Sequence, residues 1–236
     1  MDAEAVILAG GFGSRLRSVV SDLPKPMADI NGKPFLIFIL DYLKHQNVNK
    51  AVLSVGYRSE SIIDYFGEEF NGISLKYAVE EEPLGTGGGI RLATEQTDSK
   101  DIIILNGDTF FDVNLKEMLN FHNVCNADIS IAVKEMFDFD RYGVVEYDDQ
   151  SHITAFKEKE HRDQGMINGG VYIIKNSVFD SLALPEKFSF EKEVLESKNE
   201  LIKLAYNKSA TAYFIDIGIP EDYQKAQDEL ERITSR

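Results

Sequence analysis

The chain has 236 residues, 43% of them hydrophobic, with 15 Phe and 10 Tyr. This length and apolar content suffice for one large α/β domain with a sizeable core, which excludes wholesale disorder. The formal net charge of −15 argues against a nucleic-acid-binding protein, because an acidic surface repels a phosphate backbone. An anionic substrate would need a site that concentrates positive charge locally.

Cysteine usage and apolar run lengths give the expected compartment. The single cysteine, Cys125, excludes a disulfide framework, and the four His residues show no metal-ligand spacing. The acidic first residues predict no signal peptide, and the longest strongly apolar run, residues 35–40, is too short to span a bilayer. We expect a cytoplasmic protein that binds neither membranes nor nucleic acid. A homo-oligomer is compatible with the sequence.

Strand and helix patterns alternate along the first half of the chain. Short apolar runs predict strands at residues 5–8, 51–55, 74–79 and 102–105. Apolar residues at helical spacing predict helices at residues 34–45, 59–66 and 87–94. This alternation is typical of a parallel sheet with helices on both faces, in which ligands bind beyond the carboxyl ends of the strands.

The second half contains more strands and fewer helices. The patterns predict strands at residues 128–133, 143–147, 152–156, 170–174 and 212–215. They predict helices at residues 114–122, 190–197 and 220–233. We therefore expect a Rossmann-like, three-layer α/β/α fold with a mixed, mostly parallel central sheet. Without a repeat or linker, residues 1–236 form one expected domain, with a nucleotide-binding half (1–112) and a half for a second substrate (113–236).

A glycine-rich segment follows the first predicted strand. Gly10, Gly11 and Gly13 allow the backbone to turn tightly, and their N–H groups predict an anion site at the start of a helix. Arg15 adds a planar donor for phosphate oxygens. The two prolines that flank Lys25 predict a stiff, extended segment that presents its ammonium group. A strand-to-helix turn with solvated charges is the alternative, since the spacing matches neither a Walker A loop nor the dinucleotide fingerprint.

Two aspartates far apart in the sequence each follow a predicted strand. Asp108 comes after the strand at 102–105, and Asp216 comes after the strand at 212–215. Carboxylate oxygens in a phosphate site suit Mg²⁺, which takes one or two protein carboxylates and completes its shell with phosphate and water oxygens. Either aspartate alone is typical of a strand-end turn or a helix cap, and the pair together favours the metal.

Residues 80–89 combine three adjacent glutamates with four glycines in five residues. The glutamates alone are typical of a solvated loop. The glycines predict a backbone that lies flat against another group, such as a purine or a ribose. A carboxylate can accept both donors of a guanine edge and would be repelled by the carbonyls of uracil or thymine.

The combined pattern of residues 10–16 and 24–26 resembles the signature of the sugar nucleotidyltransferases. The resemblance covers nearly all of the chain. It is strongest to the D-glycero-D-manno-heptose 1-phosphate guanylyltransferases, through segments 23–27, 82–88, 105–112, 138–143 and 214–223. It implies a fold of the nucleotide-diphospho-sugar transferase type. It also implies transfer of GMP from GTP to a sugar 1-phosphate, the heptose, with release of pyrophosphate and with Mg²⁺ as cofactor.

The resemblance also implies roles for individual residues. The implied catalytic residues are Arg15, Lys25, Asp108, Lys159 and Asp216, with the metal on Asp108 and Asp216. The implied nucleotide-binding residues are Leu8, Ala9, Gly10, Gly11, Gly13, Ser14, Arg15, Lys25, Glu80, Pro83, Gly85, Thr86, Gly107 and Asp108. Glu80 is expected to read the base, with Glu82 as the second choice. The implied sugar-phosphate-binding residues are Arg141, Tyr142, Gly143, Glu158, Lys159, Asn168 and Gly169.

Some positions depart from the family pattern. Ser14 replaces the usual Thr, Phe214 replaces a frequent Trp, and Glu160 replaces the Pro that usually follows Lys159. Alternatives within the enzyme class are a mannose-1-phosphate guanylyltransferase and an N-acetylmuramate- or hexose-1-phosphate uridylyltransferase. An alternative of another class is a nucleotide-sensing module without turnover. The joint presence of two cations and two aspartates at motif positions argues against that module.

Overall fold

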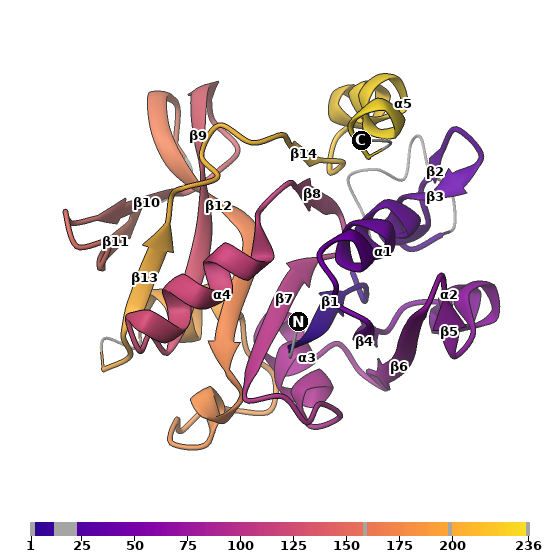
Figure 1. Cartoon of the computed structure of the whole chain (residues 1–236), viewed down its shortest axis with the longest axis horizontal. Helices are drawn as coiled ribbons and strands as arrows, with labels where there is room; N and C mark the ends of the chain where they lie inside the picture. Colours follow the sequence, from indigo (N-terminus) through magenta and orange to yellow (C-terminus); the bar gives the residue numbers. More distant parts are fainter. Residues whose placement is uncertain (1–2, 12–22, 158–159, 198–199, 235–236) are drawn as a thin grey trace.

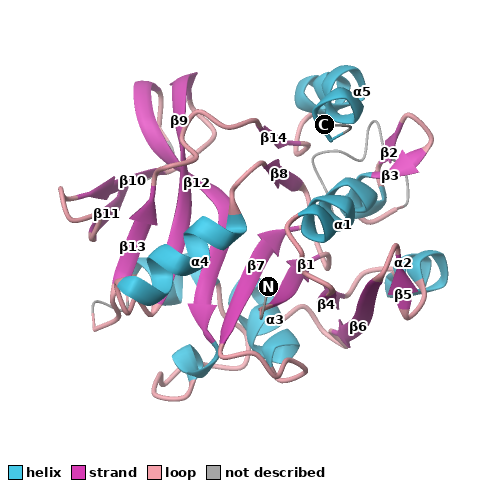
Figure 2. Ribbon diagram, viewed as in Figure 1, coloured by secondary structure: helices cyan, strands magenta, loops and turns pink. Residues whose placement is uncertain are grey.

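A computed structural model describes residues 3–11, 23–157, 160–197 and 200–234. Within these residues a ten-stranded sheet runs through the molecule, with helices against both faces (Figures 1 and 2). This arrangement confirms the expected three-layer fold with a mixed central sheet. Two small additional sheets pair β2 (Asp29–Ile30) with β3 (Lys33–Pro34) and β8 (Thr109–Phe111) with β14 (Phe214–Asp216).

The parallel part of the sheet comes from the first half of the chain. Its strands, in spatial order, are β7 (Asp101–Asn106), β1 (Glu4–Leu8), β4 (Lys50–Val55) and β6 (Ile73–Val79), with the short β5 (Glu69–Phe70) antiparallel at the edge. The residues of β1 are apolar almost without interruption because both faces are covered: Ala5 and Ile7 pack into one hydrophobic cluster and Val6 into the other.

The second half of the chain extends the same sheet through one long strand. β12 (Arg162–Lys175) pairs antiparallel with β7 and also with β9 (Ile129–Phe139) and β10 (Val144–Tyr147). The strands β11 (Ile153–Lys157) and β13 (Lys203–Tyr206) pair with β10 and β9. The β9–β12 register shifts between Asn168 and Tyr172, where Gly170 has a φ of +72°. After this bulge, β12 pairs with β7 from the first half of the chain as well as with β9 from the second.

Helices from distant parts of the sequence cover the two faces. The hydrophobic cluster on one face includes residues of α1 (Phe35–His45), α2 (Ser59–Phe66), α4 (Leu115–Val124) and α5 (Pro220–Thr234). The cluster on the other face includes residues of α3 (Gly85–Thr94), η2 (Asn176–Phe179) and η3 (Phe190–Glu196). The contact between α3 and η3 brings residues about a hundred positions apart together beside the carboxyl ends of the parallel strands.

The predicted elements agree with the structure in type and differ in extent. β9 and β12 are much longer than the predicted strands at 128–133 and 170–174, because their polar outer ends pair with each other beyond the apolar core. The predicted strand at 212–215 begins later, at Phe214. β13 and the short strands β2, β3, β5 and β8 were not predicted. Helix α3 begins at Gly85, so the glycine cluster lies inside a helix.

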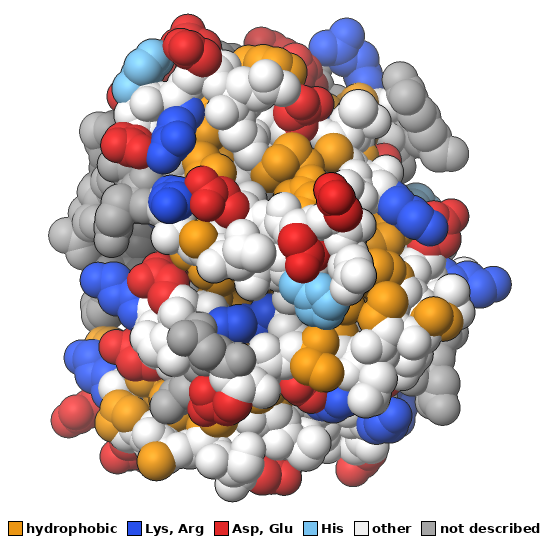
Figure 3. All heavy atoms as spheres, turned by 90° about the vertical axis from the view of Figure 1, so that its left-hand side faces the viewer, with side chains coloured by type: hydrophobic (Ala, Val, Ile, Leu, Met, Phe, Trp, Pro, Cys, Tyr) orange, Lys and Arg blue, Asp and Glu red, His pale blue; other side chains and the backbone are white. Residues whose placement is uncertain are grey.

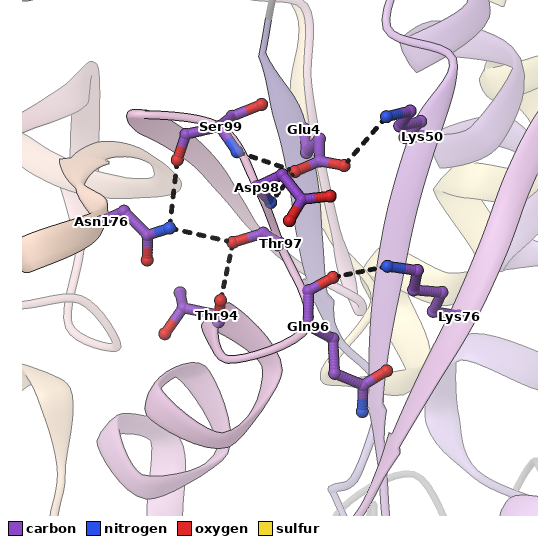
Figure 4. Close-up of polar contacts among 9 residues, drawn as sticks. All are labelled: Glu4, Lys50, Lys76, Thr94, Gln96, Thr97, Asp98, Ser99 and Asn176. Atoms are coloured by element: carbon purple, nitrogen blue, oxygen red, sulfur yellow. Dashed lines mark hydrogen bonds and ion pairs between the residues drawn. The ribbon is translucent and has the colours of Figure 1, made fainter.

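The amino ends of the parallel strands carry a polar cluster (Figure 4). The Glu4 carboxylate accepts hydrogen bonds from the N–H groups of Asp98 and Ser99 and lies 3.6 Å from the Lys50 ammonium. Burial alone would raise the pKa of Glu4, but these partners hold it below its ordinary value. Asn176 ties the same loop to η2. Because Glu4 begins β1, this cluster lies at the opposite sheet edge from the carboxyl ends.

Charged side chains of both signs lie on one face of the molecule. The face in Figure 3, on the β10–β11 side, carries acidic and basic side chains interspersed with apolar patches. No helix within the described ranges is both long and apolar enough to cross a membrane.

Candidate functional site

A cavity of about 420 Å³ lies at the carboxyl ends of β1 and β7. It is lined by Leu8, Gly10, Gly11, Lys25, Pro26, Ser54, Glu80, Pro83, Gly85, Thr86, Asn106, Asp108 and Glu191. Most of the predicted nucleotide-binding residues are in this lining. Ala9 and Gly107 are beside it without lining it, and Gly13, Ser14 and Arg15 lie outside the described residues.

Lys25 and Asp108 form an ion pair in the wall of this cavity, which also carries the carboxylates of Glu80 and Glu191. The Lys25 ammonium lies 2.7 Å from Asp108 Oδ2, and its side chain is only 16% exposed. The two flanking prolines predicted an extended segment at Lys25, and this prediction is wrong. Pro24 is extended, with a ψ of 145°, but Lys25 begins a single 3₁₀ turn that ends at Met27. The fixed φ of Pro26 fits such a turn as well as an extended segment, so the prolines alone did not decide between them.

The glycine before Asp108 lets two strand ends approach each other. Gly107 donates its N–H to the Leu8 carbonyl at 2.9 Å, and a Cβ at Gly107 would lie 2.4 Å from that oxygen. Any other residue would force β7 away from β1. Gly107 therefore positions Asp108 through the backbone and makes no direct contribution to the cavity wall.

The second predicted metal ligand, Asp216, is the last residue of β14. It lies near enough to Asp108 for the charge of Asp108 to shift its pKa. Burial raises the pKa of Asp216 above its ordinary value, and the negative charge of Asp108 raises it further, while a backbone N–H and two nearby cations oppose the rise. Its Oδ1 accepts the Gly218 N–H at 2.8 Å. Two half-buried carboxylates that repel each other are a donor set that suits Mg²⁺.

This pair does not form a complete metal cage. Within the described part of the chain, no group of three or more His, Cys, Asp or Glu side chains is arranged to hold a metal ion. A bound Mg²⁺ would need oxygen ligands from phosphate and water, which is its usual behaviour in phosphoryl-transfer sites.

Glu80, and not Glu82, lines the cavity. Its Oε1 accepts the Ser54 hydroxyl at 3.1 Å, and its Oε2 accepts the Leu84 N–H at 2.9 Å. The adjacent Glu81 and Glu82 are exposed and do not line the cavity. Glu80 is thus held in place by two protein hydrogen bonds, and each of its oxygens retains a further lone pair for a ligand.

The glycine cluster has a different role from the predicted contact with a base or ribose. A Cβ at Gly87 would lie 2.1 Å from the Phe188 ring, and one at Gly88 would lie 2.7 Å from the Glu186 carbonyl. A Cβ at Gly89 would meet Ser54 and Glu80 at 2.8 Å. These three glycines therefore let α3 pack against the 186–188 segment and the sheet. Only Gly85, with a φ of +76°, also lines the cavity.

A second cavity of about 420 Å³ adjoins the first. It is lined by Asn106, Tyr142, Gly143, Phe156, Lys157, Asn168, Tyr172, Ser189, Glu191, Lys192, Leu195 and Glu196. Three predicted sugar-phosphate residues, Tyr142, Gly143 and Asn168, are in this lining, whereas Glu158 and Lys159 lie outside the described residues. Asn106 and Glu191 line both cavities, so the two spaces meet between them.

Two further residues predicted on the sugar side do not line the second cavity. Gly169 is buried, and a Cβ there would lie 2.5 Å from the Phe111 ring. Arg141 pairs with Asp222 of α5 at 2.7 Å, stacks over the Tyr142 ring and lines a separate cavity together with Asp216. Burial alone would lower the pKa of Arg141, but this ion pair raises it. Arg141 and Asp216 therefore share a cavity that is distinct from the two described above, although Tyr142 lines both this cavity and the second one.

Sequence reasoning missed several cavity residues. Asn106 lines the cavity and directly precedes the predicted Gly107-Asp108 pair. Its position at the end of a buried strand is the sequence feature that could have indicated its role. Ser189, Glu191 and Lys192 come from the start of η3, where the sequence shows only a capped helix. Their position at the cavity depends on the contact between α3 and η3, which no local sequence pattern indicates.

Comparison with known proteins agrees with this geometry. The chain matches the nucleotidyl transferase (NTP_transferase) family over residues 4–233. It belongs to that family.

Similar proteins share almost its full length. It is 52% identical over 97% of the chain and 98% of the relative to D-glycero-alpha-D-manno-heptose 1-phosphate guanylyltransferase of Aneurinibacillus thermoaerophilus. It is 48% identical over 93% of the chain and 96% of the relative to the Campylobacter jejuni protein of the same name. Its fold is similar to that of HddC from Yersinia pseudotuberculosis complexed with GMP-PN, with a TM-score of 0.86 and 39% identity over 96% and 99% of the two chains.

Proposed function

We propose that this chain transfers GMP from GTP to D-glycero-α-D-manno-heptose 1-phosphate, giving GDP-heptose and pyrophosphate. The observation that carries the proposal is the pair of adjoining cavities that meet at Asn106 and Glu191, with Lys25 and Asp108 on the wall of the first. Two substrates that must react with each other need two such adjoining spaces. The names of the two close relatives and the GMP-PN complex of HddC support guanine and heptose as the two groups.

The chemistry asks little of the protein beyond alignment and charge neutralisation. The sugar phosphate is already an oxygen nucleophile at neutral pH, so attack on the α-phosphate needs no general base and no covalent enzyme intermediate. Lys25 places positive charge in the wall of the first cavity, which would hold the triphosphate. Tyr142, Gly143 and Asn168 supply a polar wall for the sugar. Mg²⁺ held by Asp108 and Asp216, when bound, would supply further positive charge at the phosphates.

A pyrophosphate-release assay tests the proposal. The four common nucleoside triphosphates are combined with heptose, mannose and N-acetylmuramate 1-phosphates. The proposal expects the highest kcat/KM for GTP with the heptose. A preference for mannose 1-phosphate or for UTP would replace it with one of the alternative transferases. Nucleotide binding without pyrophosphate release in any combination would favour a sensing module.

A further inference from the structure

Glu191 lies where the two cavities meet. It is the second residue of η3 and is half-buried, and it lines both the nucleotide-side and the sugar-side cavity. Its carboxylate is held by hydroxyl groups from two different elements. One comes from Thr86 at the start of α3, and the other comes from Ser189 at the cap of η3.

The hydrogen-bond direction at Thr86 is determined by its partners. The Phe190 N–H donates to Thr86 Oγ1 at 2.9 Å, and Thr86 Oγ1 lies 2.6 Å from Glu191 Oε2. A hydroxyl has a single proton, and a carboxylate oxygen is an acceptor. The Thr86 hydroxyl therefore accepts from the backbone and donates to Oε2.

Ser189 repeats the same arrangement. The Lys192 N–H donates to Ser189 Oγ at 3.2 Å, and Ser189 Oγ donates to Glu191 Oε2 at 2.8 Å. Both hydroxyls thus point at one oxygen of the carboxylate. No donor in the described ranges is within hydrogen-bond distance of the other oxygen, Oε1. The two bonds to Oε2 therefore fix the side chain. Among the described residues Oε1 remains an acceptor, on a side chain that lines both cavities.

We propose that Glu191 Oε1 accepts a hydrogen bond from a substrate hydroxyl and makes Glu191 a specificity-determining residue. This inference rests on the proposed function, which supplies two substrates rich in hydroxyl groups: the ribose of GTP and the sugar of the sugar phosphate. A carboxylate at this position would repel phosphate oxygens, so a hydroxyl is the complementary ligand group. The ribose and the sugar carry the same chemistry, and experiment separates them.

Glu191→Gln is the informative substitution. The glutamine carbonyl oxygen can keep both hydroxyl donors of Thr86 and Ser189, while its NH₂ group replaces the acceptor at Oε1. The start of η3 therefore keeps its internal contacts, and the substitution changes only the group at Oε1 from an acceptor to a donor. Glu60→Gln, at an exposed position of α2, is the matched charge control.

Binding affinities measured by calorimetry show which of the two substrates supplies the hydroxyl group, and they do not require turnover. In the ribose arm, GTP is compared with its 2′-deoxy and 3′-deoxy forms. In the sugar arm, the protein is saturated with a non-hydrolysable GTP analogue. The heptose phosphate is then compared with mannose 1-phosphate and with ring-deoxygenated forms. Loss of a charge-assisted hydrogen bond predicts that Glu191→Gln reduces the preference for the hydroxylated ligand about ten-fold or more in one arm. Glu60→Gln should leave both preferences unchanged.

Unchanged preferences in both arms of a folded Glu191→Gln protein would overturn the inference, since a purely structural Glu191 predicts that result. If that variant fails to fold, Glu191→Asp retains the charge but withdraws it by one methylene, and it should lose the same preference. Failure of the proposed function looks different: the wild-type protein then releases no pyrophosphate, while the calorimetric preferences still decide the role of Glu191.

Discussion

At the scale of single residues, the two aspartates are expected to act through charge. Asp108→Asn and Asp216→Asn each remove one of two carboxylates whose negative charges repel each other. Each should lower the Mg²⁺-dependent rate by a factor on the order of a hundred or more, because each loses a charged metal ligand. The melting temperature of Asp216→Asn should not fall, since removing one charge relieves the repulsion and an asparagine oxygen can still accept the Gly218 N–H. That of Asp108→Asn should fall, because the ion pair with Lys25 is lost. Pyrophosphate release and thermal unfolding measure the two effects, and wild-type rates in both variants would contradict the metal assignment.

Glu80 carries a second residue-scale prediction. If its remaining lone pairs accept the N1–H and amine of guanine, Glu80→Gln should narrow the preference for GTP over UTP by about ten-fold or more. A glutamine can still bridge Ser54 and Leu84, because its oxygen accepts the Leu84 N–H and its NH₂ donates to the serine oxygen. Glu82→Gln, exposed and outside the cavity, is the control. A GTP preference that survives in Glu80→Gln would limit Glu80 to a structural role.

The sequence predicted some of these residues and missed others for a physical reason. Lys25, Glu80 and Asp108 each lie in a short motif or at a strand end, and both signals are local. Glu191 lacks a local signal, because its hydrogen bond to Thr86 joins residues 105 positions apart. Such a contact depends on the packing of α3 against η3, which pattern reasoning does not reach.

At the scale of elements, the predictions succeeded where one period dominates. The parallel strands are short apolar runs buried on both faces, so their positions follow from composition. β9 and β12 extend past the core into polar sequence, where pairing between the strands replaces burial and no local pattern marks their ends. The glycines of α3 have low helix propensity. They nevertheless stand within a helix, because larger residues at these positions would collide with Phe188 and Glu186.

The packing of α4 on the sheet predicts how stability depends on pH. His122 is 1% exposed; its Nδ1 lies 2.9 Å from Ser130 Oγ, and its Nε2 lies 3.7 Å from Asp101 Oδ1. Burial lowers the pKa of His122 from 6.5 to about 4, although Asp101 opposes this. The folded protein therefore holds fewer protons than the unfolded chain between these values. The free energy of unfolding should fall as the pH drops below 6.5, by about 2 kcal/mol near pH 5.

Denaturant unfolding at about pH 7.5 and pH 5 measures this fall. His122→Gln has no titrating ring, so the difference between the two pH values should shrink in the variant even if the variant is less stable at both. Asp128 and Glu4, whose pKa values are lowered, lose their stabilising effect at lower pH and contribute little in this window. A pH dependence that is equal in the wild type and the variant would contradict the assignment to His122.

At the scale of the whole molecule, one sheet joins the two substrate cavities. β7 ends in Asn106, which lines both cavities, and β12 pairs with β7 while contributing Asn168 and Tyr172 to the second. The division of the chain at residue 112 therefore separates sequence segments whose strands belong to a single sheet. The cavities lie at the boundary between the segments, so relative movement of the halves would change the junction at which the substrates must meet.

The whole fold is expected to be independent of the metal that its reaction needs. Two large apolar clusters on the faces of the sheet supply the core, and Asp108 and Asp216 lie at its edge. Removing divalent cations with EDTA should therefore abolish pyrophosphate release but shift the melting temperature by no more than about one or two degrees. Restoring Mg²⁺ should restore activity. A large loss of thermal stability in EDTA would show that a metal ion holds the fold together, and it would contradict a purely catalytic role for the aspartate pair.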